Sequence, residues 1–338
     1  MMKSSFKSVM AAAIALGVSA AAMPAKAEEA SYILATASTG GTYYPVGVAL
    51  STLTKVKLHS DHGIAMSAIN SAGSGENVRL LRENEAQFAI LQGLFGYYAA
   101  TGTGPLASEG AQDLRSISML WQNVEHFIVA ADAATSGTVD DFGALKGESM
   151  ALGRQNSGTI GSNMALLEGL GIDMEADYSL VHSGYGPSAE ALQNGQVKGI
   201  STPAGVPVGA VSQLMATMGD QAKILDFTDD QLISADGGRN LWTRYVIPAG
   251  TYPGQDADVA TIAQPNFLAS RSDVSEENAY MITKTIYENL PFLQAIHPAT
   301  KAMAIEKAIA GLPLPLHPGA AKYYAEVGVE IPDRLIAD

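Results

Sequence analysis

The sequence has no cysteine among its 338 residues. Disulfides and thiolate chemistry are therefore excluded, and the fold must rest on its hydrophobic cores. Long apolar runs are scarce as well. Residues 9–22 form one that is too short to span a bilayer, and no later segment has enough uninterrupted apolar residues to do so. We therefore expect no direct membrane insertion.

Positive charge is also in short supply. Twenty lysines and arginines face 34 aspartates and glutamates, giving a formal net charge of −14. An acidic surface argues against nucleic acid or anionic lipid as a partner. The net charge does not determine the charge inside a cleft. An anionic ligand bound there would have to be held by local amides and a few cations.

Signatures of catalysis are missing too. The sequence has no Walker-type glycine loop, no G-x-S-x-G and no H-E-x-x-H. His59 and His62 are close together, but their polar neighbours favour a solvated loop over a metal site. His182 and Ser183 are adjacent, so on a strand they would point to opposite faces. We therefore predict a protein that is not an enzyme, without metal or cofactor, and regard an exported hydrolase as disfavoured.

The first 27 residues have the pattern of a secretory signal peptide. Lys3 and Lys7 give a basic start, the apolar run follows, and Ala25-Lys26-Ala27 fits a small-x-small cleavage site. We predict cleavage after Ala27 and export, most simply to a bacterial periplasm. The remaining chain is long enough for two domains.

A strand, a glycine-bearing turn and a helix are predicted at residues 31–57. The apolar run at 32–35 indicates a buried strand, and apolar residues at helical spacing follow the turn at 36–41. Thr42 suits the N-cap, and Pro45 falls in the first turn, where its missing amide has no helical partner. Such a turn would aim free amides and the hydroxyls of Ser38, Thr39 and Thr42 at an anion or carboxylate. The alternative is an ordinary glycine-bearing loop.

The same device recurs along the chain. Strand 64–70 leads to a turn at 71–77 with Ser74 as the expected N-cap, strand 86–91 closes at Gln92-Gly93, and strand 149–152 leads to a turn at 153–159. Shorter strands at 178–181 and 197–201 end in similar turns. In a parallel sheet such turns gather at the carboxyl edge, where α/β ligand sites form.

This pattern predicts an α/β protein of two lobes. Lobe I comprises residues 31–131 and 228–338, and lobe II comprises residues 132–227. Each is expected to be a mostly parallel sheet with helices on both faces, with the ligand cleft between the lobes.

Five segments carry a resemblance to a known family. They are STGGTYYPVG at 38–47, GSGEN at 73–77 with the Leu80-Leu81 and 85–90 stretches, SGT at 157–159, ALQNGQ at 191–196 and YPGQDADV at 252–259. In this order they resemble the TAXI family of solute-binding proteins that serve TRAP transporters. The match covers nearly all of the chain after the signal peptide.

The resemblance implies a periplasmic receptor of the type II binding-protein fold, closing on its ligand by hinge bending. It would deliver a small carboxylate, such as glutamate, a dicarboxylate or a keto acid, to a TRAP-type permease driven by an ion gradient, and we expect it to act as a monomer. A receptor for an ABC importer, or a ligand sensor, is the alternative. Ala72, Gly93 and Arg154-Gln155-Asn156 depart from the family pattern, which leaves the ligand open.

Candidate ligand contacts lie in the turns of both lobes. Their amides and hydroxyls would hold a carboxylate, and Tyr43 or Tyr185 would cover an apolar stem. Arg154 would bind a second carboxylate bidentately, unless it forms a surface salt bridge; Arg239 and Arg244 are weaker candidates. Asn77 is as well explained by a helix cap. The candidates are Thr39, Gly40, Gly41, Thr42, Tyr43, Ser74, Asn77, Gln92, Arg154, Ser157, Gly158, Thr159, His182, Tyr185, Thr202 and Pro203.

Overall fold

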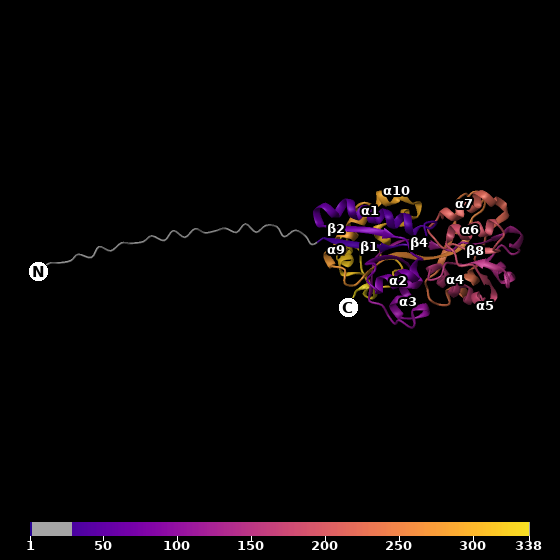
Figure 1. Cartoon of the computed structure of the whole chain (residues 1–338), viewed down its shortest axis with the longest axis horizontal. Coiled ribbons are helices and arrows are strands. Elements are labelled where there is room, and N and C mark those ends of the chain that lie inside the picture. The colour runs from indigo at the N-terminus through magenta and orange to yellow at the C-terminus, as the bar shows by residue number, and fades with distance from the viewer. Residues whose placement is uncertain (2–28, 338) are drawn as a thin grey trace.

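The structure is a computed structural model that describes Met1 and residues 29–337. Apart from Met1, the predicted signal peptide lies outside the described residues, as does its cleavage site. Two sheets divide the described chain into two lobes that lie side by side along the long axis (Figure 1). The predicted fold class, a two-lobed α/β protein, is confirmed.

Lobe I is built on a six-stranded sheet. Its strands are β1 (Ala30–Ala35), β2 (Ile64–Ile69), β3 (Phe88–Gln92), β4 (Leu114–Val124), β10 (Thr243–Ile247) and β11 (Val259–Arg271). Strand β1 pairs in parallel with β2 and β3, with Ala35 opposite both Ile69 and Ala89. The turns after these three strands therefore meet at one edge. Strand β11 is antiparallel to β3, β4 and β10, so the sheet is mixed rather than mostly parallel.

Lobe II is built on a five-stranded sheet, which is mixed as well. Its strands are β5 (Phe127–Ala130), β6 (Ser149–Ala151), β7 (Ser179–Leu180), β8 (Gly199–Ser201) and β9 (Ala222–Ile224). Strand β6 is parallel to β7 and β8, whereas β5 is antiparallel to β8 and β9. The turns after β6, β7 and β8 gather at the edge that faces lobe I.

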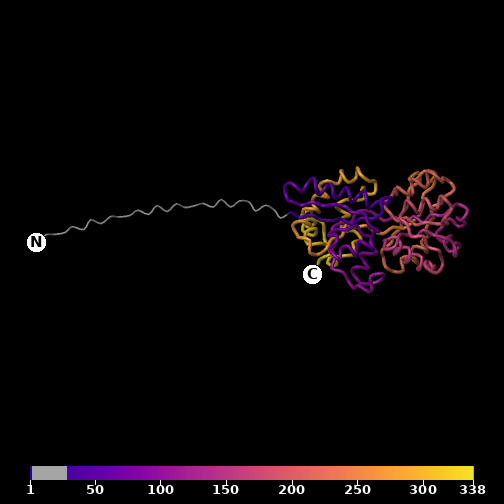
Figure 2. The backbone as a smooth tube through the Cα atoms, in the orientation of Figure 1, coloured from indigo at the N-terminus to yellow at the C-terminus, as the bar shows by residue number. Residues whose placement is uncertain are grey.

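Helices cover both sheets, with short 3-10 segments between them. The α-helices are α1 (Tyr43–His62), α2 (Ser74–Arg82), α3 (Gly93–Thr101), α4 (Gly158–Gly169), α5 (Met174–Asp177), α6 (Tyr185–Gln193), α7 (Gly209–Met218), α8 (Asp229–Asp236), α9 (Glu276–Glu288), α10 (Leu290–Ile296) and α11 (Pro318–Glu326). Helix α9 packs against α1 and α11. The C-terminal part of the chain therefore lies in lobe I beside the first strands (Figure 2).

The chain passes between the sheets in few places. Strand β4 continues into β5 of the other sheet through Glu125 and His126. The return follows α8, which packs on α4 of lobe II before β10 rejoins the first sheet. The loop that joins β10 to β11 also reaches lobe II, where the Tyr252 hydroxyl accepts a hydrogen bond from the Val208 amide (3.0 Å). These are the segments available to a hinge, while the lobe boundaries at residues 131 and 227 stay a prediction.

Apolar packing stabilises the region beside the crossing. The Phe127 ring meets Phe142 and Phe227 edge to face, with ring centroids 4.9 and 5.5 Å apart. All three side chains are buried. Aromatic pairs of this geometry contribute about 0.5–1.5 kcal/mol each beyond their burial. They give the start of lobe II a rigid base in a chain without disulfides.

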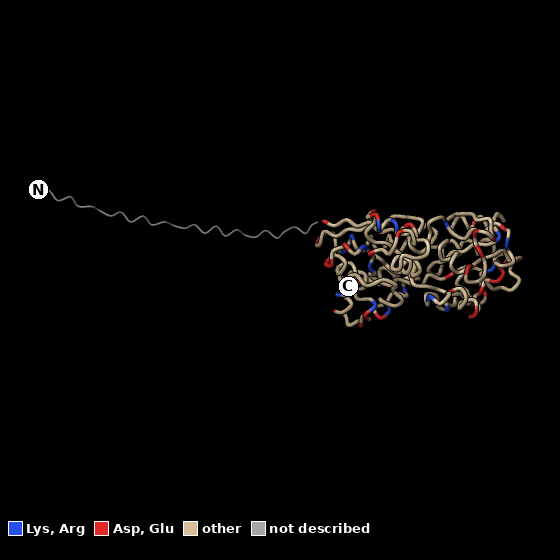
Figure 3. Tube along the Cα trace, turned by 90° about the horizontal axis from the view of Figure 1, so that it is seen from below, with Lys and Arg blue, Asp and Glu red and all other residues tan. Residues whose placement is uncertain are grey.

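The surface of the molecule carries its charges in a mixed pattern. Red acidic and blue basic positions are interspersed over both lobes (Figure 3). Within the described residues, no helix is both long and apolar enough to cross a bilayer. His59 and His62 lie in the last turn of α1, so the expectation of a loop there is wrong.

Candidate functional site

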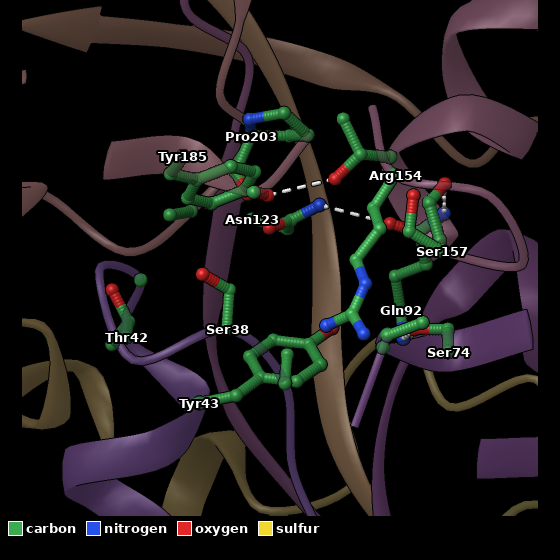
Figure 4. A pocket seen from close by; sticks show the side chains of 18 of the residues that line it. Ser38, Thr42, Tyr43, Ser74, Gln92, Asn123, Arg154, Ser157, Tyr185 and Pro203 are labelled. Carbon is green, nitrogen blue, oxygen red and sulfur yellow. Dashed lines mark hydrogen bonds between the residues drawn. The ribbon is translucent and has the colours of Figure 1, made fainter. Parts of the chain in front are cut away.

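A pocket lies between the two lobes, where the turns after the strands meet (Figure 4). The empty space at this site amounts to about 510 Å³, part of which is open to solvent. Both lobes contribute to the wall. The lining residues are Ala37, Ser38, Gly41, Thr42, Tyr43, Ala72, Gly73, Ser74, Gln92, Asn123, Arg154, Ser157, Gly158, Thr159, Ser183, Gly184, Tyr185, Pro203 and Ala204.

Four helices begin at this pocket, two from each lobe. The first residues of α1, α2, α4 and α6 are Tyr43, Ser74, Gly158 and Tyr185, and all four line it. The first amides of a helix lack intrahelical partners, and each helix N-terminus carries roughly half a positive charge. Four such ends around one small space make a strongly anion-attracting environment.

The turn before α1 connects the lobes rather than capping its own helix. Thr42 occupies the N-cap position, but its hydroxyl makes no cap and donates instead to the Gly205 carbonyl (2.9 Å). Gly41 and Thr42 line the pocket, whereas Thr39 and Gly40 do not. The Gly40 carbonyl accepts a hydrogen bond from the Ala210 amide (3.4 Å), which is a second contact between the lobes.

The turn before α2 differs from the expectation by one residue. Gly73 is the N-cap, with φ of 117°, a conformation that favours glycine, and Ser74 is the first helical residue. The Ser74 hydroxyl oxygen accepts a hydrogen bond from the Gln92 amide (3.1 Å), tying the helix to the end of β3. The same hydroxyl also interacts with the side chain of Tyr43.

Tyr43 is held rigidly in the wall of the pocket. Its hydroxyl donates to the Asn266 side-chain oxygen, and its ring packs edge to face on Trp121. Burial raises the pKa of Tyr43 far above its usual range, so its hydroxyl is neutral. The ring therefore offers an apolar surface close to polar groups.

Lobe II supplies a chain of hydroxyl groups. Ser157 caps α4, its oxygen accepting from the Ile160 amide (3.1 Å). The Tyr185 hydroxyl donates to the Pro203 carbonyl (2.6 Å), and the Thr159 and Tyr185 hydroxyls lie 2.8 Å apart. Burial raises the pKa of Tyr185 well above its usual range. The network is therefore uncharged and fixed in geometry.

Arg154 is the one charged side chain among the described residues that line the pocket. It projects from the turn after β6, and Figure 4 shows it extending toward Tyr43. In the described part of the chain its side chain has neither an ion pair nor a hydrogen bond. The side chain is exposed, and its role as a ligand contact stays a prediction. A free guanidinium at the wall can take a carboxylate bidentately.

Most of the predicted contacts come together in this pocket, and their roles in binding stay a prediction. Those that line it are Gly41, Thr42, Tyr43, Ser74, Gln92, Arg154, Ser157, Gly158, Thr159, Tyr185 and Pro203. Thr39, Gly40, Asn77, His182 and Thr202 lie outside it. Arg239 and Arg244 also lie outside, and Arg244 pairs with Asp229 (2.6 Å).

Three of the outlying residues occupy different surroundings. Asn77 is fully buried, and its amide donates to the Thr36 and Ile90 carbonyls (2.8 and 2.9 Å), so it binds strand ends together rather than capping a helix. His182 is exposed on the surface. Thr202 is fully buried beneath the pocket.

Several lining residues were not among the candidate contacts: Ala37, Ser38, Ala72, Gly73, Asn123, Ser183, Gly184 and Ala204. Of these, only the Ser38 hydroxyl was expected from the sequence to point at an anion. Ser38, Ser183 and their neighbours belong to turns already singled out. Asn123 is the informative omission, since its amide donates to the Gln92 side-chain oxygen (3.2 Å) at the back of the pocket. Its only sequence signal is a polar residue near the end of an apolar strand.

The lobes touch through glycines that leave no room for a side chain. A Cβ on Gly75 would lie 2.6 Å from the Asn156 carbonyl oxygen, and one on Gly158 would lie 2.8 Å from the Ser74 hydroxyl. A Cβ on Gly161 would lie 2.7 Å from the Phe95 ring. The Glu76 amide also donates to the Asn156 carbonyl (2.8 Å). The structure is thus one in which the lobes are fully together.

Two buried titratable groups occupy the crossing between the lobes. Burial raises the pKa of Glu125 to about 8 and lowers the pKa of His126 to about 4. The Trp242 indole donates to Glu125 (3.2 Å), and the Tyr252 hydroxyl lies 2.8 Å from His126. Near pH 7 both groups are therefore uncharged.

Two mixed α/β lobes with a pocket between them define the two-lobed binding-protein class. The chain belongs to the NMT1-like family, whose profile matches residues 34–328.

Two solved structures with TM-scores above 0.5 share this fold at low sequence identity. MatC from Rhodopseudomonas palustris, solved with bound malate, is 15% identical with a TM-score of 0.54, over 88% of this chain and 97% of MatC. A protein from Bordetella bronchiseptica is 16% identical with a TM-score of 0.52, over 90% of this chain and 86% of that protein. The periplasmic aliphatic sulphonate binding protein SsuA from Escherichia coli is 14% identical with a TM-score of 0.46, over 88% and 84%.

Proposed function

We propose that this chain is a periplasmic receptor that captures a small carboxylate between its lobes and delivers it to a membrane permease. One observation carries the proposal: four helix N-termini and the unpaired Arg154 converge on a pocket that no acidic side chain lines among the described residues. Positive potential without a counter-charge favours an anion. A space of about 510 Å³ is of the size that small-molecule sites have.

Binding would be coupled to closure of the lobes. A ligand shifts an equilibrium between open and closed forms only through its extra affinity for one of them. Contacts on both lobes, such as Ser74 and Ser157, can be made together only when the lobes meet. The ligand would therefore stabilise the closed form, with bending at the segments that connect the sheets.

The pocket favours a receptor over a hydrolase. Serines and tyrosines line it, but among the described lining residues there is no histidine, lysine or carboxylate to act as a general base.

The decisive experiment compares Arg154→Gln with Lys198→Gln, which removes a positive charge from an exposed position elsewhere in lobe II. Hydrogen bonds to charged groups contribute about 1.5–3 kcal/mol, which corresponds to roughly 10- to 150-fold in affinity. We expect Arg154→Gln to weaken binding of malate or 2-oxoglutarate by this factor in calorimetry on refolded protein, and Lys198→Gln to leave it unchanged. Equal affinity in both variants would contradict the assignment of Arg154.

The delivery partner is proposed to be a TRAP-type permease, on the resemblance of the turn motifs to the TAXI family. Reconstituted uptake by a permease encoded beside this gene would test it. Uptake should require this protein and an ion gradient but no ATP. Dependence on ATP hydrolysis would instead support an ABC importer, and binding without transport would support a sensor.

A further inference from the structure

The pocket has polar groups on every side, and several of its acceptor oxygens already receive a hydrogen bond from within the protein. Hydrogen bonds within the protein already engage the main acceptors. The Pro203 carbonyl accepts from Tyr185 (2.6 Å), and the Gly158 carbonyl accepts from the Gln92 amide group (2.7 Å). The Gln92 side-chain oxygen accepts from Asn123 (3.2 Å). The acceptors that remain among the described lining residues are neutral carbonyl and hydroxyl oxygens, whereas Arg154 is a charged donor.

Acidic side chains near the pocket are engaged elsewhere. Glu76 accepts a hydrogen bond from the Ala72 amide (2.6 Å) and lies within ion-pair distance of Arg79 (3.7 Å). Glu125 is fully buried and accepts from the Trp242 indole. Neither lines the pocket. Among the described residues, no carboxylate is therefore in position to neutralise a ligand cation.

An ammonium group would be unfavourable in this environment. It carries a positive charge and three donors, and it needs acceptors or a counter-charge when it leaves water. Here it would meet Arg154 and the positive ends of four helices. A hydroxyl or keto oxygen at the same position would instead accept from the free donors.

We propose that the site takes a small hydroxy- or oxo-acid without an amino group and rejects the amino acid of the same carbon skeleton. This inference rests on the proposed function, because it concerns the selectivity of the same carboxylate pocket. It narrows the range of ligands expected from the sequence, because that range included glutamate. The discriminating feature is the absence of an acidic wall among the described lining residues.

Matched ligand pairs test the proposal. Calorimetry on protein refolded without ligand should compare 2-oxoglutarate with L-glutamate and L-malate with L-aspartate. We expect the acid without an amino group to bind at least about tenfold more tightly in any pair that binds. An amino acid that binds as tightly as its partner overturns the selectivity but leaves the carboxylate receptor standing. No binding by any of the four overturns the receptor for carboxylates itself.

A charge introduced into the wall provides an independent test. Asn123→Asp places a carboxylate at the back of the pocket with little change in shape, and Asn194→Asp adds the same charge at the exposed end of α6. We expect Asn123→Asp to weaken the oxo-acid and to reduce its advantage over the amino acid severalfold. Asn194→Asp should leave the ratio of the two affinities, oxo-acid to amino acid, unchanged. A ratio that is unaltered in a folded Asn123→Asp protein contradicts the proposal.

Discussion

Replacing Gly75 with alanine should separate closure of the lobes from the stability of the open protein. Gly75 is the second residue of α2, and a Cβ there would lie 2.6 Å from the Asn156 carbonyl oxygen of lobe II. Real Cβ atoms essentially never come within 3.0 Å of such a neighbour, so the lobes would have to separate. Separation would also stretch the hydrogen bond from the Glu76 amide to the same carbonyl.

The magnitude follows from these contacts. Overpacking of a tight interface costs about 1–3 kcal/mol, and the clash exists only when the lobes meet. The variant should therefore bind its ligand roughly 5- to 150-fold more weakly. In the open form the contact with Asn156 is absent, and the nearest remaining neighbour of the Cβ is the Phe95 ring of the same lobe at 3.3 Å, a side chain that can shift. Alanine also favours the helix by up to about 1 kcal/mol. The ligand-free protein should therefore be no less stable than the wild type.

Calorimetry and small-angle X-ray scattering provide the assay. Scattering with saturating ligand should show a larger radius of gyration for Gly75→Ala than for the wild type. Gly186→Ala is the matched control, because Gly186 is the second residue of α6 and a Cβ there would have no neighbour within 4 Å. Wild-type affinity and wild-type compaction in Gly75→Ala would refute the reasoning.

Two further predictions concern stability. The pKa of Glu125 is raised to about 8, so its contribution to the free energy of unfolding is lost as pH rises from about 4.5 to 8. The pKa of His126 is lowered to about 4, so its contribution to the free energy of unfolding is lost as pH falls from about 6.5 to 4. The two effects oppose each other below pH 6.5, so the effect of Glu125 is clearest between pH 6.5 and 8. There the free energy of unfolding measured in urea should fall by up to about 1.4 kcal/mol per pH unit, and Glu125→Gln should abolish this fall. An identical slope in wild type and variant would exclude Glu125 as its source. Asn77→Ala should lower the free energy of unfolding by about 1–3 kcal/mol, because it leaves buried carbonyls without donors, while ligand affinity measured by calorimetry stays near the wild-type value. A selective loss of affinity would instead make Asn77 a ligand contact.

The turns after strands were predictable because their signals are local. Glycine pairs, small polar residues and apolar runs identify the turns at Gly41, Gln92 and Ser157 from the sequence alone, and parallel pairing brings the turns of each lobe to one edge of its own sheet. Arg154 was likewise found because it lies in such a turn. Local patterns therefore located most of the pocket.

The remaining features depend on pairings that the sequence does not reveal. Asn123 reaches the pocket because β4 lies against β11, with Asn123 opposite Gln264, far away along the chain. Asn77 lies in the turn and helix expected at the cleft, yet its side chain donates to the Thr36 and Ile90 carbonyls at the ends of two strands. Thr42 fits an N-cap, but a carbonyl of the other lobe competes for its hydroxyl. In each case a tertiary partner overrides the local preference.

The glycine contacts also bear on how ligand length is selected. Gly75 and Gly161 lie outside the pocket wall, and each contacts the other lobe so closely that no side chain would fit between them. The separation of the two walls is thus fixed by atoms that the ligand never touches. An oversized acid would prop the lobes apart, and an undersized one would leave a void. Every acid that permits full contact would leave the protein with the same outer shape, so a permease could recognise the loaded receptor without reading its cargo.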